Sequence, residues 1–200
     1  MKILGLELST ARGSLAWLDQ DNADLTREWP NDRKNSAVFF ENLAAVSKKF
    51  GAPETIIVGL GPGSYAGTRI AISAAIGLQI SSGAHLIGFP SISAMQCDAH
   101  EYCVIGDARR KSFFFARIRA NNVVEGPTLF SESELKPKLN AVGTAMPVFT
   151  SDSLPQFEHA VVRFPSALLL ARLAREPQRG FSLPPFEPIY LREPHITMAK

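Results

Sequence analysis

The sequence contains few of the residues that build metal sites and disulfide frameworks. It has two cysteines and four histidines in 200 residues. Cys97 and Cys103 are too few for a disulfide framework or a four-cysteine zinc site, so we read them as free, buried thiols. No two histidines stand four residues apart, the spacing at which a helix presents two metal ligands. We therefore predict no metal site.

Long apolar runs are also absent. No window approaches the roughly 20 consecutive apolar residues that a membrane-spanning helix needs. Residues 1–14 carry an acid within their apolar run, unlike a signal peptide, so we expect a cytoplasmic protein that does not contact a membrane. The net charge of +2 is too small to predict a protein that binds a phosphate backbone unaided. We expect any contact with nucleic acid to be made through a partner.

Hydrophobic residues make up 46% of the chain, enough for one sizeable core or for two small lobes that share a hinge. The first half alternates short apolar runs with amphipathic segments and predicts the order βββαβαβα. The expected strands and helices are residues 2–8, 13–18, 23–29, 37–50, 54–60, 68–82, 85–89 and a short helix after Ser91.

The pattern partly restarts after residue 97, which predicts a second, smaller lobe. Strands are expected at 103–105, 112–118 and 148–150 and a helix at 166–175, whereas the tail from Pro177 lacks periodicity and predicts extended chain. We therefore divide the chain into an N-terminal lobe of residues 1–97 and a C-terminal lobe of residues 98–200.

The helix predicted at 68–82 is apolar on almost every side. Isoleucines at 72, 76 and 80 form one ridge, and alanines with Leu78 form a flatter surface. A helix of this kind must be covered on both sides. One side can lie on a sheet, and the small side chains allow another helix to come close.

Four segments resemble the bacterial TsaB (YeaZ) family. They are ILGLELST at Ile3–Thr10, GPGSYAGTRI at Gly61–Ile70, DARRKSFF at Asp107–Phe114 and PIYLRE at Pro188–Glu193. They occur in the order and rough spacing of that family and span nearly the whole chain.

This resemblance implies an α/β fold of the actin/Hsp70/sugar-kinase type, which is ribonuclease H-like, with two lobes and a reduced C-terminal lobe. TsaB-like proteins are paralogues of TsaD and pair with it through their N-terminal lobes. With TsaE they serve threonylcarbamoylation of adenosine 37 in tRNAs that read ANN codons. The resemblance thus implies a non-catalytic subunit with no cofactor of its own, in a complex that uses ATP and contacts tRNA.

Three departures from the family pattern concern the nucleotide contacts. Glu7 stands where the first strand usually ends in Asp. Tyr65 and Ala66 replace the common Phe and Thr of the glycine-rich motif, and Asn35 with Ser36 replaces a frequent His-Ser pair. These changes bear on nucleotide or metal binding and leave the scaffold interpretation unaffected.

The turn after the first predicted strand is the place where actin-type proteins hold phosphate. Here it contains Glu7, Ser9 and Thr10, with a glycine only at position 13. A longer acid in a less open turn would crowd Mg²⁺, which is strict about its coordination distances. We interpret these residues as a vestigial phosphate loop, with a catalytic Glu7 as the alternative.

The glycine-rich turn admits two interpretations. Its residues Gly61, Pro62, Gly63, Ser64, Gly67 and Arg69 could hold an anion at a helix N-terminus. The turn lacks both the Walker lysine and the dinucleotide fingerprint. We favour a structural turn in which glycines allow tight packing, with Arg69 in a structural or interface ion pair.

Asp107, Arg109 and Arg110 form a basic turn that we place near the hinge between the lobes. A basic turn is usually solvated surface. We expect a structural salt bridge from Asp107, with a minor role in positioning tRNA as the alternative.

The two long predicted helices are assigned to the partner surface. The residues chosen are Phe39, Leu43, Val46, Ala71, Ala74, Ala75 and Leu78. Without TsaD the same surface should pair with a second copy, because exposed apolar area costs about 25 cal/mol per Å². Two other hypotheses are a small ATPase or kinase that uses Glu7 and the Gly61–Gly67 turn, and direct tRNA binding, for which the charge is modest.

Overall fold

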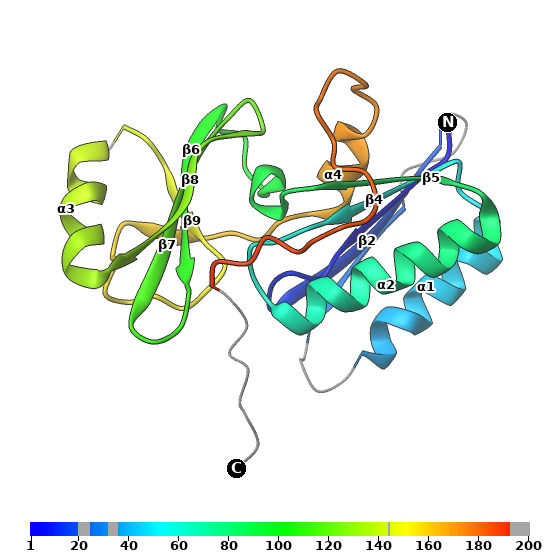
Figure 1. The fold of residues 1–200 in the computed structure, drawn as a ribbon, viewed down its shortest axis with the longest axis horizontal. Helices are drawn as coiled ribbons and strands as arrows, with labels where there is room; N and C mark the ends of the chain where they lie inside the picture. The colour runs from blue at the N-terminus through cyan, green and yellow to red at the C-terminus, as the bar shows by residue number, and fades with distance from the viewer. Residues whose placement is uncertain (20–24, 32–35, 144, 193–200) are drawn as a thin grey trace, which may run out of the picture.

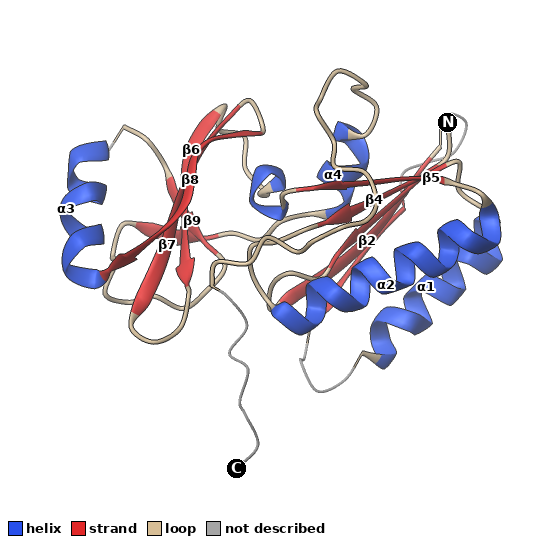
Figure 2. Cartoon of the chain, in the orientation of Figure 1, coloured by secondary structure: helices blue, strands red, loops and turns tan. Residues whose placement is uncertain are grey.

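The computed structural model describes residues 1–19, 25–31, 36–143 and 145–192. The chain forms two lobes, each built on a five-stranded mixed sheet (Figures 1 and 2). Asn35, one of the residues that depart from the family pattern, lies outside the described residues.

The first sheet has the strand order β3-β2-β1-β4-β5. Its strands are β1 (Ile3–Glu7), β2 (Arg12–Leu18), β3 (Leu25–Pro30), β4 (Thr55–Gly59) and β5 (His85–Phe89). The first three are antiparallel, as the predicted hairpin requires, and β4 and β5 run parallel to β1. The buried TIIV run in β4 is typical of a strand that is covered on both faces.

Helices cover both faces of this sheet. The helices α1 (Ala37–Phe50) and α2 (Tyr65–Ser82) share one hydrophobic cluster on one face. The helix α4 (Ala167–Leu173) and the 3-10 helix η1 (Ser91–Ala94) share a second cluster on the other face (Figure 1). Alternate residues of β1 serve the two clusters, because successive side chains of a strand point to opposite faces.

The second sheet has the order β10-β9-β6-β7-β8 and repeats the topology of the first. Its elements are β6 (Glu101–Asp107), β7 (Ser112–Arg119), β8 (Asn122–Ser131), α3 (Glu132–Val142), β9 (Val148–Thr150) and β10 (Ala160–Val162). As in the first lobe, three antiparallel strands precede a helix and two parallel strands. Residues 151–159 form no counterpart of α2, so this lobe is reduced.

The repeated topology agrees with the two-lobe α/β fold that the resemblance implies, including its reduced C-terminal lobe. The division at residue 97 needs one correction. The helix α4 was assigned to the second lobe but packs on β1, β2 and β4 of the first sheet. Phe181, Phe186 and Ile189 of the tail also join the first lobe's hydrophobic clusters. The chain therefore returns to the first lobe because that sheet has a second apolar face to cover.

No helix in the described ranges is both long and apolar enough to cross a lipid bilayer.

Candidate functional site

The glycine-rich turn connects β4 to α2 and packs against the turn after β1. Ser64 caps α2, with its hydroxyl accepting from the backbone N–H of Gly67 at 3.3 Å. A Cβ at Gly63 would lie 2.1 Å from the carbonyl oxygen of Ser9, and one at Gly67 would lie 2.0 Å from that of Leu8. These two glycines are therefore required by the chain's own packing. This geometry supports the structural interpretation of the motif.

Glu7 ends β1 with its side chain directed away from α1 and α2, on the same face of the strand as Ile3 and Gly5. The residue is fully buried, and its Oε1 accepts from the backbone N–H of Ser9 at 2.6 Å. A Cβ at Gly59 would lie 1.8 Å from Oε2, so the carboxyl group fills the space that this glycine leaves empty. Glu7 is not among the residues that line the cleft between the lobes.

The protonation of Glu7 is governed by its burial. Desolvation disfavours the carboxylate and raises the pKa of Glu7 above its usual value. The hydrogen bond from the Ser9 backbone N–H opposes this effect because it favours the charged form. A carboxyl group in this position supports the turn between β1 and β2. It does not present a carboxylate to a ligand in the cleft.

The basic turn between β6 and β7 is organised by Asp107. One carboxylate oxygen accepts from the backbone N–H of Arg109 at 2.7 Å, and the other forms an ion pair with the Arg109 guanidinium at 3.2 Å. Asp152 accepts from the backbone N–H of Asp107 at 2.9 Å. Arg109, Arg110 and Lys111 all adopt positive φ values, 65°, 53° and 59°. The turn therefore exposes three consecutive basic side chains at the edge of the second lobe.

These turns meet at a cleft of about 830 Å³ between the lobes. Of the residues singled out in the sequence, the cleft brings together Ser9, Thr10, Pro62, Gly63, Ser64, Asp107, Arg109 and Arg110. Gly61, Gly67 and Arg69 lie outside its lining, as Glu7 does. The cleft is thus lined by the turn after β1, by the N-terminus of α2 and by the basic turn.

Sequence reasoning did not place Asp152, Tyr190 or Arg192 in the cleft. Asp152 follows β9, and Tyr190 and Arg192 belong to the tail. The tail reaches the cleft because the Ile189 N–H donates to the Leu60 carbonyl at 2.8 Å, beside the glycine-rich turn. The segment PIYLRE was noticed only as a family motif, and no periodicity in it indicates where it folds.

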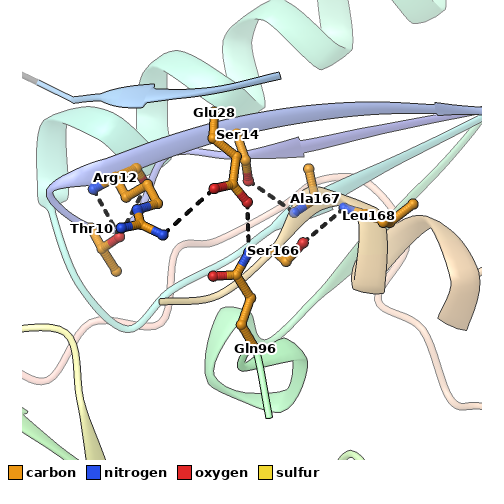
Figure 3. A network of polar contacts seen from close by, with 8 residues as sticks. All are labelled: Thr10, Arg12, Ser14, Glu28, Gln96, Ser166, Ala167 and Leu168. Carbon is orange, nitrogen blue, oxygen red and sulfur yellow. Dashed lines mark hydrogen bonds and ion pairs between the residues drawn. The ribbon is translucent and has the colours of Figure 1, made fainter. Parts of the chain in front are cut away.

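A polar network holds the two chain segments that connect the lobes (Figure 3). Glu28 of β3 forms an ion pair with Arg12 at 3.5 Å and accepts from the Gln96 side chain at 2.6 Å. Ser14 accepts from the backbone N–H of Ala167 at 2.9 Å, at the start of α4. Gln96 precedes the second lobe and Ala167 follows it. The strands β2 and β3 of the first sheet therefore hold both of the segments that connect the lobes.

None of the seven side chains assigned to the partner surface is exposed. Phe39, Leu43, Val46, Ala71 and Ala75 are buried in the first lobe's own core, and Ala74 and Leu78 are half-buried against it. The reason is that the flat alanine side of α2 packs on β4 and β5, where small residues let the helix approach the sheet.

Other side chains of the same helices face outward. On α1 they include Val38 and Phe40, which are 36% and 49% exposed. On α2 they include Ile76 and Ile80, which are 36% and 80% exposed. Two of these four residues lie near the start of α1 and two in the second half of α2, and we call the four together the outer helix face. It is apolar, and no part of the chain that the structure describes covers it fully.

The described residues contain no group of three or more His, Cys, Asp or Glu side chains placed to hold a metal ion. This observation does not test whether the chain binds a metal or holds a cofactor when isolated. Both expected absences stay predictions. What the arrangement offers is an open cleft with basic residues at one edge, and an apolar helix pair on the opposite face of the first sheet from α4 (Figure 2).

The fold and the sequence are similar to those of known proteins. Two solved structures from Pseudomonas aeruginosa have the same fold. One is an uncharacterized protein with similarity to the peptidase YeaZ (TM-score 0.76, 18% identity, 96% of this chain and 99% of that one). The other is YeaZ (TM-score 0.65, 16% identity, 88% and 91%). An uncharacterized protein of Mycobacterium leprae (strain TN) is 28% identical over 143 residues, 68% of this chain and 31% of that protein.

The chain thus spans about a third of the length of this curated relative. The family model of TsaD, tRNA N6-adenosine threonylcarbamoyltransferase, matches residues 36–145, which is more than half of the chain. This segment includes the two long helices, the glycine-rich turn and the basic turn. The chain therefore belongs to the TsaD/YeaZ family.

Proposed function

We propose that this chain is a non-catalytic scaffold subunit for threonylcarbamoylation of adenosine 37 in tRNAs that read ANN codons. It acts in the cytoplasm by forming a heterodimer with TsaD, and TsaE joins to form a ternary complex. ATP is used by the complex, and tRNA is reached through it. Membership of the TsaD/YeaZ family and the YeaZ fold support this role.

The observation that carries the proposal is the outer helix face. Four large apolar side chains on α1 and α2 are between 36% and 80% exposed, including Ile80 at 80%. Covering such side chains with a partner removes apolar area from water at about 25 cal/mol per Å². Between Ala66 and Ser81 the exposed side of α2 carries a single charged residue, Arg69. A helix surface with exposed isoleucines and a single charged residue is typical of a protein interface.

Gly77 supplies a second argument for a partner at this surface. It lies in the middle of α2, next to Ile76, and a Cβ added there would meet nothing within 4 Å. A glycine in a helix interior costs about 0.5–1 kcal/mol relative to alanine. Packing within the isolated chain therefore does not require a glycine at this position. A helix of a partner that crosses α2 closely at this point would require it, because a side chain there would block the approach.

The turn after β1, where Glu7 lies, supports a scaffold role more than an enzymatic one. Glu7 is buried beside Gly59 and Ser91, and its carboxyl group is held in a setting that favours the neutral form. A Mg²⁺-nucleotide needs oxygen ligands that face the bound phosphates. Glu7 does not line the cleft and so does not supply one.

Co-purification tests the pairing directly. We expect tagged TsaD, co-expressed with this chain, to retain it, and Ile80→Glu and Phe40→Glu to reduce the retained amount at least tenfold, about 1.4 kcal/mol. Val124→Glu is the matched control, because Val124 is 49% exposed on β8 of the other lobe. Retention of both helix variants at the level of the control would contradict the proposed interface.

The same face predicts the behaviour of the isolated chain. Without TsaD we expect a homodimer through the outer helix face, and sedimentation velocity at micromolar concentration measures it. Ile80→Glu should shift the population toward monomer. A wild-type chain that is monomeric under these conditions would count against the proposal.

The competing hypothesis is a small ATPase or kinase that uses the Gly61–Gly67 turn. The open cleft beside this turn is the observation in its favour. Calorimetry of the isolated chain with Mg²⁺-ATP separates the two hypotheses. Tight, stoichiometric binding would favour the enzyme, and the scaffold proposal predicts none.

A further inference from the structure

Two stacked tyrosines at the edge of the cleft have no part in the proposed scaffold function. The rings of Tyr65 and Tyr190 have centroids 5.4 Å apart with 30° between their planes, although one residue begins α2 and the other lies in the tail. The two residues are 49% and 41% exposed. The Arg69 guanidinium carbon lies 5.1 Å from the centre of the Tyr65 ring, and Arg69 donates to the Tyr65 hydroxyl. The cluster therefore holds aromatic rings at the surface in a fixed arrangement.

Cationic groups face the same cleft. Arg110 comes from the basic turn of the second lobe, and Arg192 comes from the tail, where it donates to the hydroxyl of Ser112 at 2.6 Å. The N-terminus of α2 also lines the cleft, and its first turn carries no acidic residue. Backbone N–H groups at that end add a partial positive charge.

The two carboxylates of the cleft offset these charges only in part. Asp107 is occupied by Arg109, through both a backbone N–H and the guanidinium. Asp152 accepts from the backbone N–H of Asp107. Within the described ranges Arg110 and Arg192 have no acidic partner at ion-pair distance. Three arginines, Arg109, Arg110 and Arg192, therefore face two carboxylates, Asp107 and Asp152, which leaves the cleft edge with a small excess of positive charge beside an aromatic surface.

We propose that the cleft edge binds a short single-stranded segment of RNA. One base stacks on the Tyr65–Tyr190 pair, and the flanking phosphates contact Arg110 and Arg192. This inference rests on the proposed function, because it gives the scaffold a direct contact with the RNA substrate. Stacking on aromatic rings combined with arginine contacts to phosphate is how proteins bind single strands without reading their sequence.

The size of the site agrees with the small net charge of the chain. A contact with about two phosphates, one for each of Arg110 and Arg192, gives a logarithmic salt dependence of about −1.4, since each phosphate of a single strand contributes about −0.7. Such a contact does not require the strongly basic surface of a protein that follows a long phosphate backbone.

A free nucleoside triphosphate fits the same observations less well. The tyrosine rings lie at the solvent-exposed edge, not in an enclosed slot that would cover both faces of a base. The two carboxylates of the cleft are also engaged within the chain, Asp107 by Arg109 and Asp152 by the Asp107 backbone N–H, so they are not free to hold the magnesium ion that accompanies a triphosphate. The RNA segment is therefore the ligand that the side chains favour.

Fluorescence anisotropy of the full chain with a labelled single-stranded RNA of about ten nucleotides tests the proposal. We expect binding in the range of about 1–100 µM at low salt. Tyr65→Ala should weaken it about tenfold, and Tyr65→Phe should stay within about twofold of wild type because it keeps the ring. Arg110→Gln should lower the affinity and reduce the salt slope by about 0.7.

The matched control is Lys136→Gln, an exposed basic residue on α3 that does not line the cleft. Its affinity should equal that of wild type. If Tyr65→Ala does not fold, as judged by circular dichroism, Tyr190→Ala and Arg110→Gln carry the test.

Three results would overturn the proposal. They are no binding of the RNA, equal affinity of the cleft variants and wild type, and displacement of the RNA by micromolar ATP, which would indicate a pocket for free nucleotide. Arg110 lies on the lobe opposite the outer helix face, so Arg110→Gln should retain TsaD in co-purification. Failure of RNA binding with TsaD pairing intact would remove this inference alone.

Discussion

At the scale of single residues, the packing around the carboxyl group at the end of β1 determines its protonation. Glu7 occupies the position where the family usually has the shorter Asp, and Gly59 of the neighbouring strand leaves the space for its longer side chain. Because burial is the largest influence on it, the pKa of Glu7 is raised. The folded chain therefore favours the protonated form more than the unfolded chain does.

Replacing Glu7 by Gln should stabilise the protein at neutral pH. As pH rises above about 4.3, the unfolded chain loses this proton while the folded chain retains it, so the wild type loses stability until the raised pKa is passed. Gln keeps the oxygen that accepts from Ser9 and carries no charge. The gain of Glu7→Gln over wild type should be small at pH 4 and larger at pH 7, by about 1.4 kcal/mol per unit of pKa elevation.

Urea unfolding at the two pH values measures this difference. A variant that is less stable than wild type at pH 7, or a difference that does not change with pH, would contradict the account of Glu7.

At the scale of elements, glycines mark where helices meet other backbone. A Cβ at Gly5 of β1 would lie 2.3 Å from the Ala167 carbonyl oxygen at the start of α4. A Cβ at Gly77 of α2 would meet no atom within 4 Å. The first glycine lets α4 lie close to the sheet, whereas the second has no role within the chain.

The same substitution should therefore have opposite effects at these two glycines. Gly5→Ala should destabilise the chain by about 2 kcal/mol or more, because backbone must move to admit the methyl group. Gly77→Ala should stabilise the isolated chain by about 0.5–1 kcal/mol through helix propensity. Chemical denaturation of the monomeric Ile80→Glu background gives both values, and effects of equal sign would be inconsistent with this packing.

The larger substitution Gly77→Leu separates stability from pairing. We expect it to leave the folding of the isolated chain intact and to weaken retention by TsaD, because it would fill the space of a crossing helix. If TsaD retains Gly77→Leu as well as it retains wild type, the partner does not bind over this part of α2.

Much of the element order follows from sequence because the signals are local. The predicted bounds of α1 and β5 agree with the structure, and glycine with proline ends α1 as expected. The helix α3 was missed because it is polar and contains Pro137, yet its capping box of Ser131 and Glu134 was a readable signal. The inward face of α2 could not be chosen from sequence, since both of its sides are apolar.

At the scale of the whole molecule, the tail links the two lobes. Phe186 and Ile189 pack on the first lobe's core, and Leu191 packs on the second lobe's core. Arg192 then bonds to Ser112 of β7. The tail crosses between the lobes in this way (Figure 1), and it places Tyr190 against Tyr65 at the cleft.

Loosening the tail should affect both stability and the cleft. The double variant Phe186→Ala, Ile189→Ala should lower the free energy of unfolding by about 1–3 kcal/mol, since both side chains are half-buried. Limited proteolysis should cut its tail faster than that of wild type. Leu183→Ala is the control, because Leu183 is 60% exposed and should change stability by less than about 0.5 kcal/mol. Equal cleavage of the three proteins would contradict the role of the tail.

The cleft was only partly predictable from sequence. Its turns were recognised as glycine-rich and basic segments, because their composition is unusual over a few residues. The contact of Tyr65 with Tyr190 joins distant parts of the chain, and the tail has no periodicity that could place it. The assignment of the partner surface to the two long helices stays a prediction, and the outward-facing side chains of these helices had to be read from the structure.

The central claim, that the chain acts through a partner and not through chemistry of its own, is tested most directly by reconstituted tRNA modification with TsaD and TsaE. Threonylcarbamoyladenosine formation should require the chain, persist with Glu7→Gln and fall at least tenfold with Ile80→Glu. Loss of modification by Glu7→Gln in a chain that still pairs with TsaD, together with full activity of Ile80→Glu, would contradict the account.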